Sequence, residues 1–300
     1  MNRRSILTSG LAAGTVAALA GAERADAAPA RRHVTIRARD GVRLFHRDWG
    51  EGRPVVFVAS WALASEMWAY QVAHLSDAGF RCIAFDRRGH GRSDMPAGGY
   101  DMDTLADDLA AVIDQLGLKE VDVVSHSMGG AETVRYLARH GTGRVRRIAL
   151  IAPAGPCLVQ TPDNPYGAPR AVLEASIAAW KSDFPKWTRE NQAPFFTPST
   201  SQPMQEWLVG QMLATPAPVA VATFRGLMDA DVRPDLARID RPTLILHGDK
   251  DASAPLEISG RRFAAGIRGS ELKVYEGAPH GLFVTHMDRV NRDLETFLTA

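Results

Sequence analysis

Short apolar runs alternate along this chain with segments whose apolar residues recur at helical spacing. The runs predict strands over residues 34–39, 42–49, 54–59, 81–85, 121–125, 145–151, 243–247 and 272–275, the first two forming a hairpin. Helical spacing predicts helices over residues 104–116, 128–140 and 288–298. Parallel strands are joined by helices that cross the sheet, so this alternation is typical of the α/β class. We expect a mostly parallel, eight-stranded sheet flanked by helices.

Residues 156–232 interrupt this alternation. They contain no convincing strand pattern, and prolines recur along them. The segment predicts a helical lid inserted between the two parts of one α/β body, residues 28–155 and residues 233–300. It is also rich in large aromatic side chains, namely Trp180, Phe184, Trp187, Phe195, Phe196 and Trp207. Lining a pocket and packing the lid onto the body explain that enrichment equally well.

Residues 1–27 carry a targeting pattern. Arg3 and Arg4 precede an Ala/Gly-rich apolar run, and Ala25 and Ala27 supply the small residues of a cleavage site. The pattern predicts a twin-arginine signal peptide, recognition by the twin-arginine translocation machinery, and a periplasmic or secreted location. A retained anchor is the alternative, but about 15 apolar residues are fewer than the roughly 20 needed to span a bilayer. We therefore expect no stable membrane insertion.

Charge and cysteine content argue against several other classes of protein. Lys and Arg total 35 against 34 for Asp and Glu, so no excess of positive charge would attract nucleic acid. The two cysteines, Cys82 and Cys157, form no CxxC pair, and no HExxH or GxGxxG pattern is present. The sequence thus predicts no metal site, no nucleotide cofactor and no disulfide framework. It carries no indication of the oligomeric state.

Ser127 is the candidate nucleophile. It lies in the SHSMG motif (125–129), on the predicted turn from a strand to the helix that follows, where small neighbours let the two backbones approach and expose the hydroxyl. The usual pattern has glycine on both flanks of the serine motif, whereas Ser125 stands at the first flank here. An ordinary polar turn, with its glycines used for helix packing, is the alternative for this pentapeptide alone.

The residues that follow Ser127 along the chain favour the nucleophile. Asp249 and Asp251 come after the strand predicted at 243–247, and His280 comes after the last predicted strand. A serine hydroxyl is a weak nucleophile unless a histidine accepts its proton and a carboxylate orients that histidine. We predict Ser127, His280 and Asp251 as this set. Asp249 is the alternative acid, although a turn-former that bonds its own backbone is its favoured role.

Three other histidines are predicted to be structural. His126 should point away from the substrate if Ser127 is exposed, and His247 should end its strand. His286 should cap or pack the last helix. Each has a weaker claim than His280 to accept the serine proton.

Longer motifs carry a family resemblance over residues 34–297. They are FDRRGHGRS (85–93), DMDT (101–104), ADDL (106–109), SHSMGG (125–130), RY (135–136), HGDKD (247–251) and GAPHGL (277–282). On these motifs the chain resembles the α/β-hydrolases, and among them the cofactor-free bacterial haloperoxidase, arylesterase and perhydrolase group. The resemblance implies the α/β-hydrolase fold with an inserted lid and no cofactor. It also assigns the acid to the second aspartate of HGDKD, which is Asp251.

The resemblance further implies an oxyanion hole made by the backbone N–H groups of Trp61 and Met128. Donors that are fixed before the reaction stabilise the charge that develops on the substrate carbonyl. Most relatives have His-Gly before the first of these donors, whereas this chain has Ala59-Ser60, which puts the expected pocket shape in doubt. The side chains of Trp61 and Met128 are expected to line the acyl pocket, with packing in the core as the alternative.

The implied activity is that of an exported serine hydrolase, which cleaves small or medium carboxylic esters or lactones through an acyl-enzyme on Ser127. In a second interpretation the chain is a perhydrolase, in which hydrogen peroxide replaces water and the peracid oxidises halide. A catalytically inactive binding protein is the third, supported only by Ser60 and Ser125. A dehalogenase is disfavoured because that chemistry needs a carboxylate where Ser127 stands.

Overall fold

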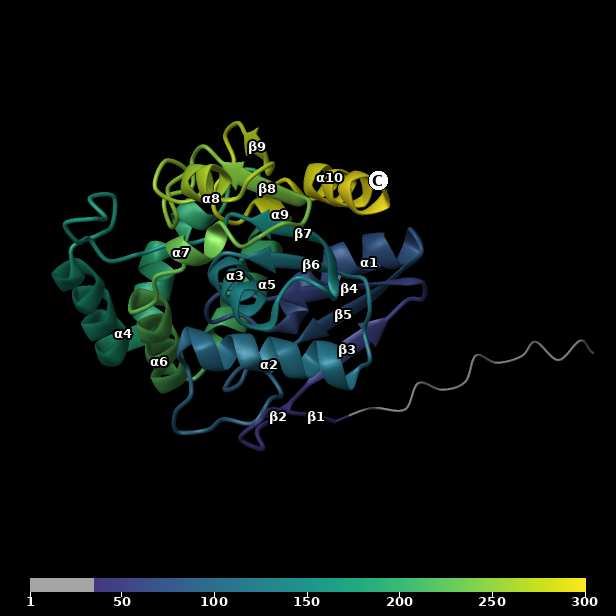
Figure 1. The fold of residues 1–300 in the computed structure, drawn as a ribbon. Helices are drawn as coiled ribbons and strands as arrows, with labels where there is room; N and C mark the ends of the chain where they lie inside the picture. Colours follow the sequence, from purple (N-terminus) through teal and green to yellow (C-terminus); the bar gives the residue numbers. More distant parts are fainter. Residues whose placement is uncertain (1–34) are drawn as a thin grey trace, which may run out of the picture. The chain divides into compact units, whose positions relative to one another are not determined.

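The structure of the protein, a computed structural model, describes residues 35–300 (Figure 1). Its central element is a seven-stranded sheet in the order β3-β5-β4-β6-β7-β8-β9, in which every neighbouring pair except β3 and β5 is parallel. The strands are β3 (His46–Trp49), β4 (Arg53–Val58), β5 (Phe80–Phe85), β6 (Val121–His126), β7 (Val145–Ile151), β8 (Thr243–Gly248) and β9 (Glu271–Tyr275). The predicted α/β class is confirmed. The predicted signal peptide, residues 1–27, lies outside the described residues.

The prediction of eight strands in one sheet is wrong. β1 (Ile36–Arg37) and β2 (Arg43–Leu44) pair with each other in a separate two-stranded sheet, and only the second half of the predicted strand 42–49 joins the main sheet. The loop after β5 engages the backbone between the two halves, because Asp94 N–H donates to Arg43 O and Phe45 N–H donates to Ser93 Oγ. Backbone groups that are used in this way cannot continue a ladder.

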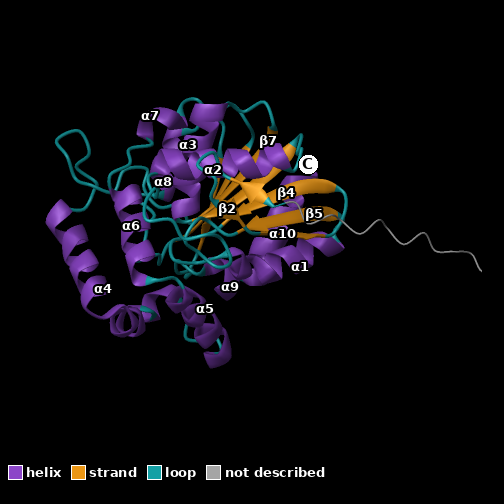
Figure 2. Ribbon diagram, turned by 90° about the horizontal axis from the view of Figure 1, so that it is seen from below, coloured by secondary structure: helices purple, strands orange, loops and turns teal. Residues whose placement is uncertain are grey.

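Helices cover both faces of the sheet (Figure 2). On one side lie α2 (Met102–Gln115), α3 (Met128–His140) and α8 (Gly260–Gly266). On the other side lie α1 (Ala69–Asp77) and α10 (Met287–Thr299). Shorter helical turns are η1 (Ser65–Trp68), α7 (Arg233–Leu236) and α9 (Leu282–Thr285).

Apolar residues on both faces of the strands explain this layering. In β4, Val56 and Val58 pack into the core beneath α2 and α3, whereas Val55 and Phe57 pack into the core beneath α1 and α10. Burying one such side chain contributes roughly 1.5–3 kcal/mol. β6 and β8 are buried along their whole length. The sheet is therefore a rigid support, and its parallel strands all end at one edge.

The segment 156–232 is built from α4 (Arg170–Asn191), η2 (Ala193–Phe195), α5 (Gln202–Ala214) and α6 (Ala217–Met228). Its prolines interrupt one helix and stand in the first turn of two others. α4 is kinked at Asp183, two residues before Pro185, and the Asp183 carboxylate accepts the Lys186 N–H at 2.9 Å to begin the second half. Proline occupies the first turn of both α5 and α6.

Close contacts hold α6 against the body. A Cβ on Gly226 would lie 2.0 Å from the carbonyl oxygen of Tyr100, so only glycine allows the helix to approach this far. The Trp61 indole N–H donates to Ala220 O at 2.8 Å. Among residues 35–300 no single helix is long and apolar enough to cross a membrane, although the bent pair of α5 and α6 passes the same test of length and composition together.

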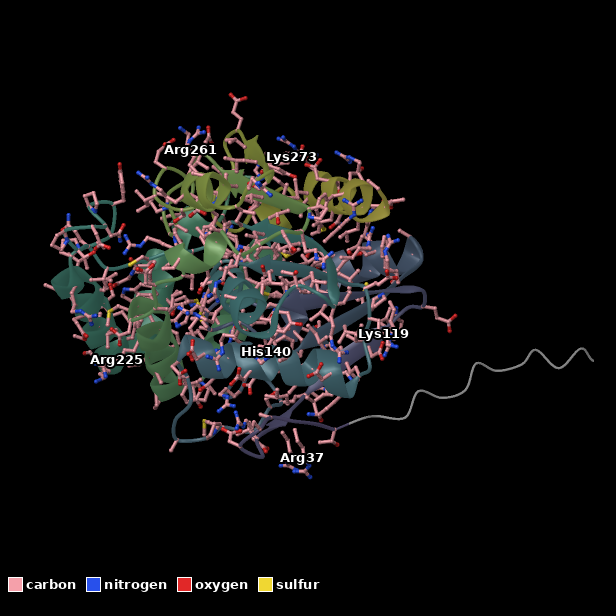
Figure 3. The ribbon with its side chains drawn as sticks, in the orientation of Figure 1. Arg37, Lys119, His140, Arg225, Arg261 and Lys273 are labelled. Carbon is pink, nitrogen blue, oxygen red and sulfur yellow. The ribbon has the colours of Figure 1, made fainter. Side chains whose placement is uncertain are left out.

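Charged side chains are spread over the surface (Figure 3). The labelled residues Arg37, Lys119 and Arg225 come from different sides of the molecule. Other basic residues are paired locally: Lys273 Nζ lies 2.9 Å from Asp293 Oδ1, and Arg261 Nε lies 2.7 Å from Glu257 Oε1. Pairs that remain in contact with solvent contribute little to stability, so the fold depends on its apolar core.

Candidate active site

Ser127 lies on a sharp turn at the carboxyl edge of the sheet. β6 ends at the preceding residue and α3 begins at the following one. Ser127 has φ 55° and ψ −120°, a left-handed conformation that costs a non-glycine residue about 1–3 kcal/mol. The turn is held because the Ser127 N–H donates to Ile151 O at 3.0 Å, while Ser127 O accepts from the Gly130 and Ala154 N–H groups. The predicted strand-to-helix turn is therefore present and strained.

Small residues after Ser127 are required by close packing. A Cβ on Gly129 would lie 2.7 Å from Val58 O, and one on Gly130 would lie 2.9 Å from the Cβ of Pro153. Ser125, which replaces the first glycine of the usual motif, is fully buried in β6, and its hydroxyl has no hydrogen-bond partner within residues 35–300. The extra hydroxyl thus fits at this position without contacting the reacting groups.

Three side chains from three different strand ends meet at this edge. His280 Nε2 lies 2.9 Å from Ser127 Oγ, and His280 Nδ1 lies 2.7 Å from Asp251 Oδ2. All three residues are at least nine-tenths buried. The structure therefore brings together Ser127, His280 and Asp251, which the sequence analysis selected by their order along the chain.

The two aspartates of the loop after β8 have different partners. Asp251 Oδ1 accepts the backbone N–H groups of Ser253 and Ala254 at 2.9 and 2.7 Å, so that its other oxygen faces His280. Asp249 Oδ1 instead accepts the Gly277 N–H at 2.7 Å and links two loops. The prediction that Asp249 bonds its own backbone is therefore wrong: Asp249 reaches the loop after β9, whereas Asp251, the carboxylate beside the histidine, makes the local bonds of its turn.

Asp251 is held in its charged form. Burial alone would raise the pKa of this carboxyl, but the neighbouring charge of His280 and the hydrogen bonds to the carboxylate outweigh burial and hold the pKa well below its usual range. Such an anion keeps the facing imidazole in one tautomer and stabilises the imidazolium that forms when it takes a proton.

The backbone donors expected for an oxyanion hole are free. Within residues 35–300, neither the Trp61 nor the Met128 N–H donates a hydrogen bond. Ser60, which stands where relatives have glycine, donates its N–H to the Met67 sulfur at 3.3 Å. This bond holds the loop after β4 at Ser60, and the N–H of the next residue, Trp61, stays available.

A cavity of about 440 Å³ adjoins Ser127 and His280. Trp61 lines it, together with Trp180, Trp187, Phe195 and Phe196 of the segment 156–232. Two further aromatic residues of that segment pack elsewhere: Phe184 is buried against Trp61, and Trp207 contacts Tyr70. Both interpretations of the aromatic residues therefore apply, each to a different subset.

The expectation that the Met128 side chain lines this cavity is wrong. Met128 is fully buried in the core beneath α2 and α3, so the packing alternative holds for it. As the first residue of α3, it follows the sharp turn at Ser127, and its side chain enters the body while the serine hydroxyl faces the cavity.

Comparison with known proteins identifies the family. The sequence pattern of the alpha/beta hydrolase fold family matches residues 53–287. This chain belongs to the α/β-hydrolase fold family. It is 42% identical to the non-heme chloroperoxidase CPO-A1 of Kitasatospora aureofaciens over 272 residues, covering 87% of this chain and 97% of that protein. It is 36% identical to the bifunctional esterase/perhydrolase DCH of Acinetobacter calcoaceticus over 280 residues, covering 88% and 99%.

Solved structures lead to the same family. An esterase from Exiguobacterium antarcticum superposes with a TM-score of 0.86 at 33% identity, covering 89% of this chain and 99% of that one. A bromoperoxidase from Bacillus anthracis superposes with a TM-score of 0.83 at 33% identity, covering 86% and 96%. The chain is thus an α/β-hydrolase with esterase and haloperoxidase relatives.

Two histidines of this hydrolase contact the set of Ser127, His280 and Asp251, although both were predicted to be structural. His126 Nε2 lies 3.0 Å from the carbonyl oxygen of His280, and His247 Nε2 lies 3.3 Å from Asp251 Oδ2. Burial, and then the charge of His280, lower the pKa of His126 to about 3, so its ring is neutral. Both histidines occupy the carboxyl ends of strands in the main sheet. That position in the sequence was the feature that could have predicted their contact with the site.

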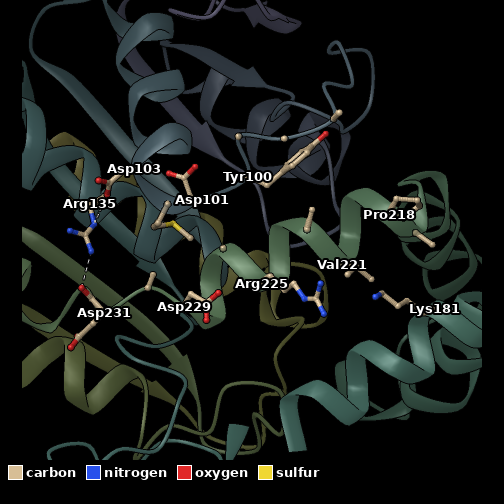
Figure 4. A pocket seen from close by; sticks show the side chains of 18 residues that line it. Tyr100, Asp101, Asp103, Arg135, Lys181, Pro218, Val221, Arg225, Asp229 and Asp231 are labelled. Atoms are coloured by element: carbon tan, nitrogen blue, oxygen red, sulfur yellow. Dashed lines mark hydrogen bonds and ion pairs between the residues drawn. The ribbon is translucent and has the colours of Figure 1, made fainter. Parts of the chain in front are cut away.

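A second cavity of the hydrolase, about 880 Å³, lies on the other side of α6 (Figure 4). Val221, Arg225 and Gly226 face it, whereas Phe224 and Leu227 of the same helix face the Ser127 cavity. Its charged groups have both signs: Arg135 lies 3.4 Å from Asp103 and donates to the backbone carbonyl of Asp231 at 2.8 Å, whereas Arg225 and Asp229 pair with residues outside the lining. Within residues 35–300, no group of three His, Cys, Asp or Glu side chains is arranged to hold a metal ion.

Proposed function

We propose that this hydrolase cleaves carboxylic esters or lactones through an acyl-enzyme on Ser127. The observation that carries the proposal is the unbroken hydrogen-bonded series from Asp251 through His280 to the Ser127 hydroxyl, at the wall of a cavity. A buried, charged acid and a histidine in hydrogen-bond contact with the serine are what serine activation needs.

Each residue has a defined role in the proposed reaction. His280 Nε2 takes the Ser127 proton as Oγ attacks the substrate carbonyl, and the Asp251 carboxylate stabilises the resulting imidazolium. The Trp61 and Met128 N–H groups donate to the oxyanion. His280 then protonates the leaving alcohol. In the second half, water attacks the acyl group, His280 accepts a water proton, and the carboxylic acid leaves as Ser127 regains its hydrogen.

The lining of the cavity favours an uncharged substrate of small or medium size. Its volume falls within the range of about 300–1,000 Å³ that is common for small-molecule sites. Apart from His280, no ionisable side chain among residues 35–300 lines it, and its walls are mostly aromatic or aliphatic. A charged acyl or alcohol group would lose its hydration there without a partner, so neutral esters and lactones fit best.

Perhydrolysis is the second candidate, favoured by relatives described as chloroperoxidases and as an esterase/perhydrolase. In this reaction hydrogen peroxide attacks the same acyl-enzyme, the acyl–Oγ bond breaks, and His280 returns the peroxide proton to Ser127. The product is a peracid, which oxidises halide in solution and is itself reduced to the carboxylic acid. No metal or cofactor enters this balance.

Export is a further part of the proposal. The twin-arginine signal in residues 1–27 would bring the chain to the translocation machinery and then to a periplasmic or secreted location. Replacing Arg3 and Arg4 together by lysine should leave the uncleaved chain inside the cell. Fractionation followed by mass determination of the mature N-terminus tests this, and unchanged export would contradict it.

A fluorophosphonate probe tests the hydrolase proposal directly. We expect stoichiometric labelling of Ser127, read by peptide mass, in the folded protein at neutral pH. A series of p-nitrophenyl esters of increasing acyl length, with and without hydrogen peroxide, then separates the two reactions by the ratio of carboxylic acid to peracid. Failure to label a folded sample would contradict both reactions and leave the binding-protein alternative.

A further inference from the structure

A buried ion pair lies directly behind the candidate oxyanion hole. Arg87, in the loop after β5, and Glu132, in α3, are 1% and 0% exposed. Arg87 Nε donates to Glu132 Oε2 at 2.8 Å, and Arg87 Nη2 lies 2.7 Å from the same oxygen. The two residues are 45 positions apart in the sequence, so the pair ties two separate elements together.

The remaining donors of this guanidinium bind the loop that carries Trp61. Arg87 Nη2 donates to Ala59 O at 2.8 Å, and Nη1 donates to Ser60 O at 3.1 Å. These are the two consecutive carbonyls that precede Trp61 in the chain. A planar guanidinium has donors in a fixed fork, so it holds both oxygens in one defined arrangement.

Because a peptide unit is planar, the contact of Arg87 with Ser60 O also fixes the direction of the Trp61 N–H. The carbonyl of Ser60 and the N–H of Trp61 belong to one planar trans peptide unit, in which the C=O and the N–H point in opposite directions. The only cis bond within residues 35–300 is that between Gly155 and Pro156. An arginine that fixes Ser60 O on one side therefore fixes the direction of the Trp61 N–H on the other.

We refer to Arg87 and Glu132 together as the clamp. Glu132 connects the clamp to the other donor, the Met128 N–H. It lies one helical turn after Met128, on the helix whose first N–H is the second oxyanion donor. That helix also contacts the loop after β4 directly, since a Cβ on Gly129 would lie 2.7 Å from Val58 O and 2.8 Å from Ala59 O. The ion pair thus joins the two elements that must keep a constant spacing while an oxyanion forms between their donors.

Stability alone does not account for the pair. Burying two charges costs free energy that the attraction often only offsets, and apolar residues of similar volume frequently stabilise a core better. Glu132 Oε1 is also buried without a hydrogen-bond donor within residues 35–300. The cost of burying this pair is understandable if the pair holds backbone groups in one fixed orientation.

We propose that Arg87, held by Glu132, is a positioning residue that aims the Trp61 N–H at the oxyanion and fixes its spacing from the Met128 N–H. This inference rests on the proposed acyl-enzyme mechanism. Neither side chain lines the Ser127 cavity. Arg87 acts through the backbone carbonyls that it holds, and Glu132 acts through Arg87.

The neighbouring Arg88 provides a matched control. It is equally buried and pairs with Asp108 through hydrogen bonds of 2.6 and 2.7 Å, with a further bond to Asp40. Its guanidinium makes no contact with residues 59–61 among the hydrogen bonds of the described chain. All four variants Arg87→Lys, Glu132→Gln, Arg88→Lys and Asp108→Asn disturb a buried ion pair, but only the first two disturb the clamp. Their comparison therefore separates the two effects.

The experiment measures kcat and KM on a p-nitrophenyl ester per active site, counted by fluorophosphonate titration, together with Tm. Arg87→Lys should lower kcat about 10- to 100-fold, somewhat less than the loss of an entire oxyanion donor, with KM changed less than about threefold. A trifluoromethyl ketone, which adds the serine and places an oxyanion in the hole, should bind more weakly by the same factor. The pH dependence of kcat/KM should keep its midpoint, because the clamp does not touch His280.

The control variants should lower Tm but keep kcat per titrated site within about twofold, since they leave the donors in place. Glu132→Gln keeps the shape of the side chain and serves if Arg87→Lys does not fold. The inference is overturned if both clamp variants keep kcat and ketone affinity, or if the control variants lose as much. If the wild-type protein is neither labelled nor active on any ester, the proposed function itself fails, which is a distinct result.

Discussion

His126 donates a hydrogen bond from Nε2 to the carbonyl oxygen of His280, 3.0 Å away, although 154 positions separate them in the sequence. Its ring also lies 4.8 Å from that of His280, and its Nδ1 has no partner within residues 35–300, which assigns the proton to Nε2. The residue before the candidate nucleophile therefore supports the backbone of the histidine that faces it.

Replacing His126 tests this support. His126→Phe should lower kcat about tenfold, because one net hydrogen bond contributes about 0.5–1.5 kcal/mol and a buried carbonyl is left without a donor. His126→Gln places a side-chain N–H near the Nε2 position and should recover most of the rate. Steady-state kinetics per titrated site give the comparison, and equal rates for the two variants would contradict the role.

The strained backbone at Ser127 leads to a paired prediction. Ser127→Ala and Ser127→Gly both remove the hydroxyl and should retain less than about one hundredth of the wild-type ester turnover. Glycine tolerates φ 55° whereas alanine does not, so the glycine variant should be more stable than the alanine variant by about 1 kcal/mol. Urea denaturation of the two inactive proteins measures this difference. An alanine variant at least as stable as the glycine variant would argue against strain at the turn.

Asp251 and Asp249 should respond differently to the same substitution. Asp251→Asn removes the charge beside His280 and allows the wrong tautomer, with an expected loss in kcat of roughly 10³- to 10⁴-fold. Asp249→Asn alters one exposed hydrogen bond to Gly277 and should change kcat less than about threefold. Kinetics on one ester decide between them; a larger loss at position 249 would reverse the assignment of the acid.

Buried His90 should make stability depend on pH. Burial, and then the charge of Arg87, lower its pKa to about 3 from the usual 6.5. Between these values His90 binds a proton in the unfolded chain but not in the folded chain, so its contribution to stability is fully present above about pH 6.5 and falls by about 1.4 kcal/mol per pH unit as pH decreases toward 3. His90→Asn keeps a donor near Nδ1 for Arg88 O and should flatten this slope by about one proton. Parallel urea midpoints for both proteins from pH 4.5 to 7 would count against this explanation.

The contact between α6 and the body can be tested at Gly226. Gly226→Ala places a methyl group 2.0 Å from Tyr100 O and should destabilise the protein by about 1–3 kcal/mol. Because α6 also lines the Ser127 cavity, KM should rise. The matched control is Gly210→Ala in α5, where an added Cβ meets nothing within 4 Å, and it should stabilise by about 0.5–1 kcal/mol. Similar Tm changes in the two variants would show that the close approach is unimportant.

Several features of the fold followed from local pattern. The predicted strand 145–151 and helix 128–140 coincide with β7 and α3, and the other central strands differ by one or two residues at their ends. The division of the opening segment between two sheets was not predictable, because hydrogen bonds with Ser93 and Asp94, far along the chain, decide where the first strands stop.

The sequence by itself determined the alternation of strands and helices and the order Ser127, Asp251, His280. Both are local properties, since parallel strands bring their carboxyl ends to one edge and any residue just after a strand lies there. Only the tertiary structure decided that Asp249 bonds Gly277 of another loop, that Met128 enters the core, and that Arg87 holds the loop before Trp61. Those outcomes depend on the packing of loops and helices that are distant in sequence, where shifts of about 1 Å decide which polar group finds a partner.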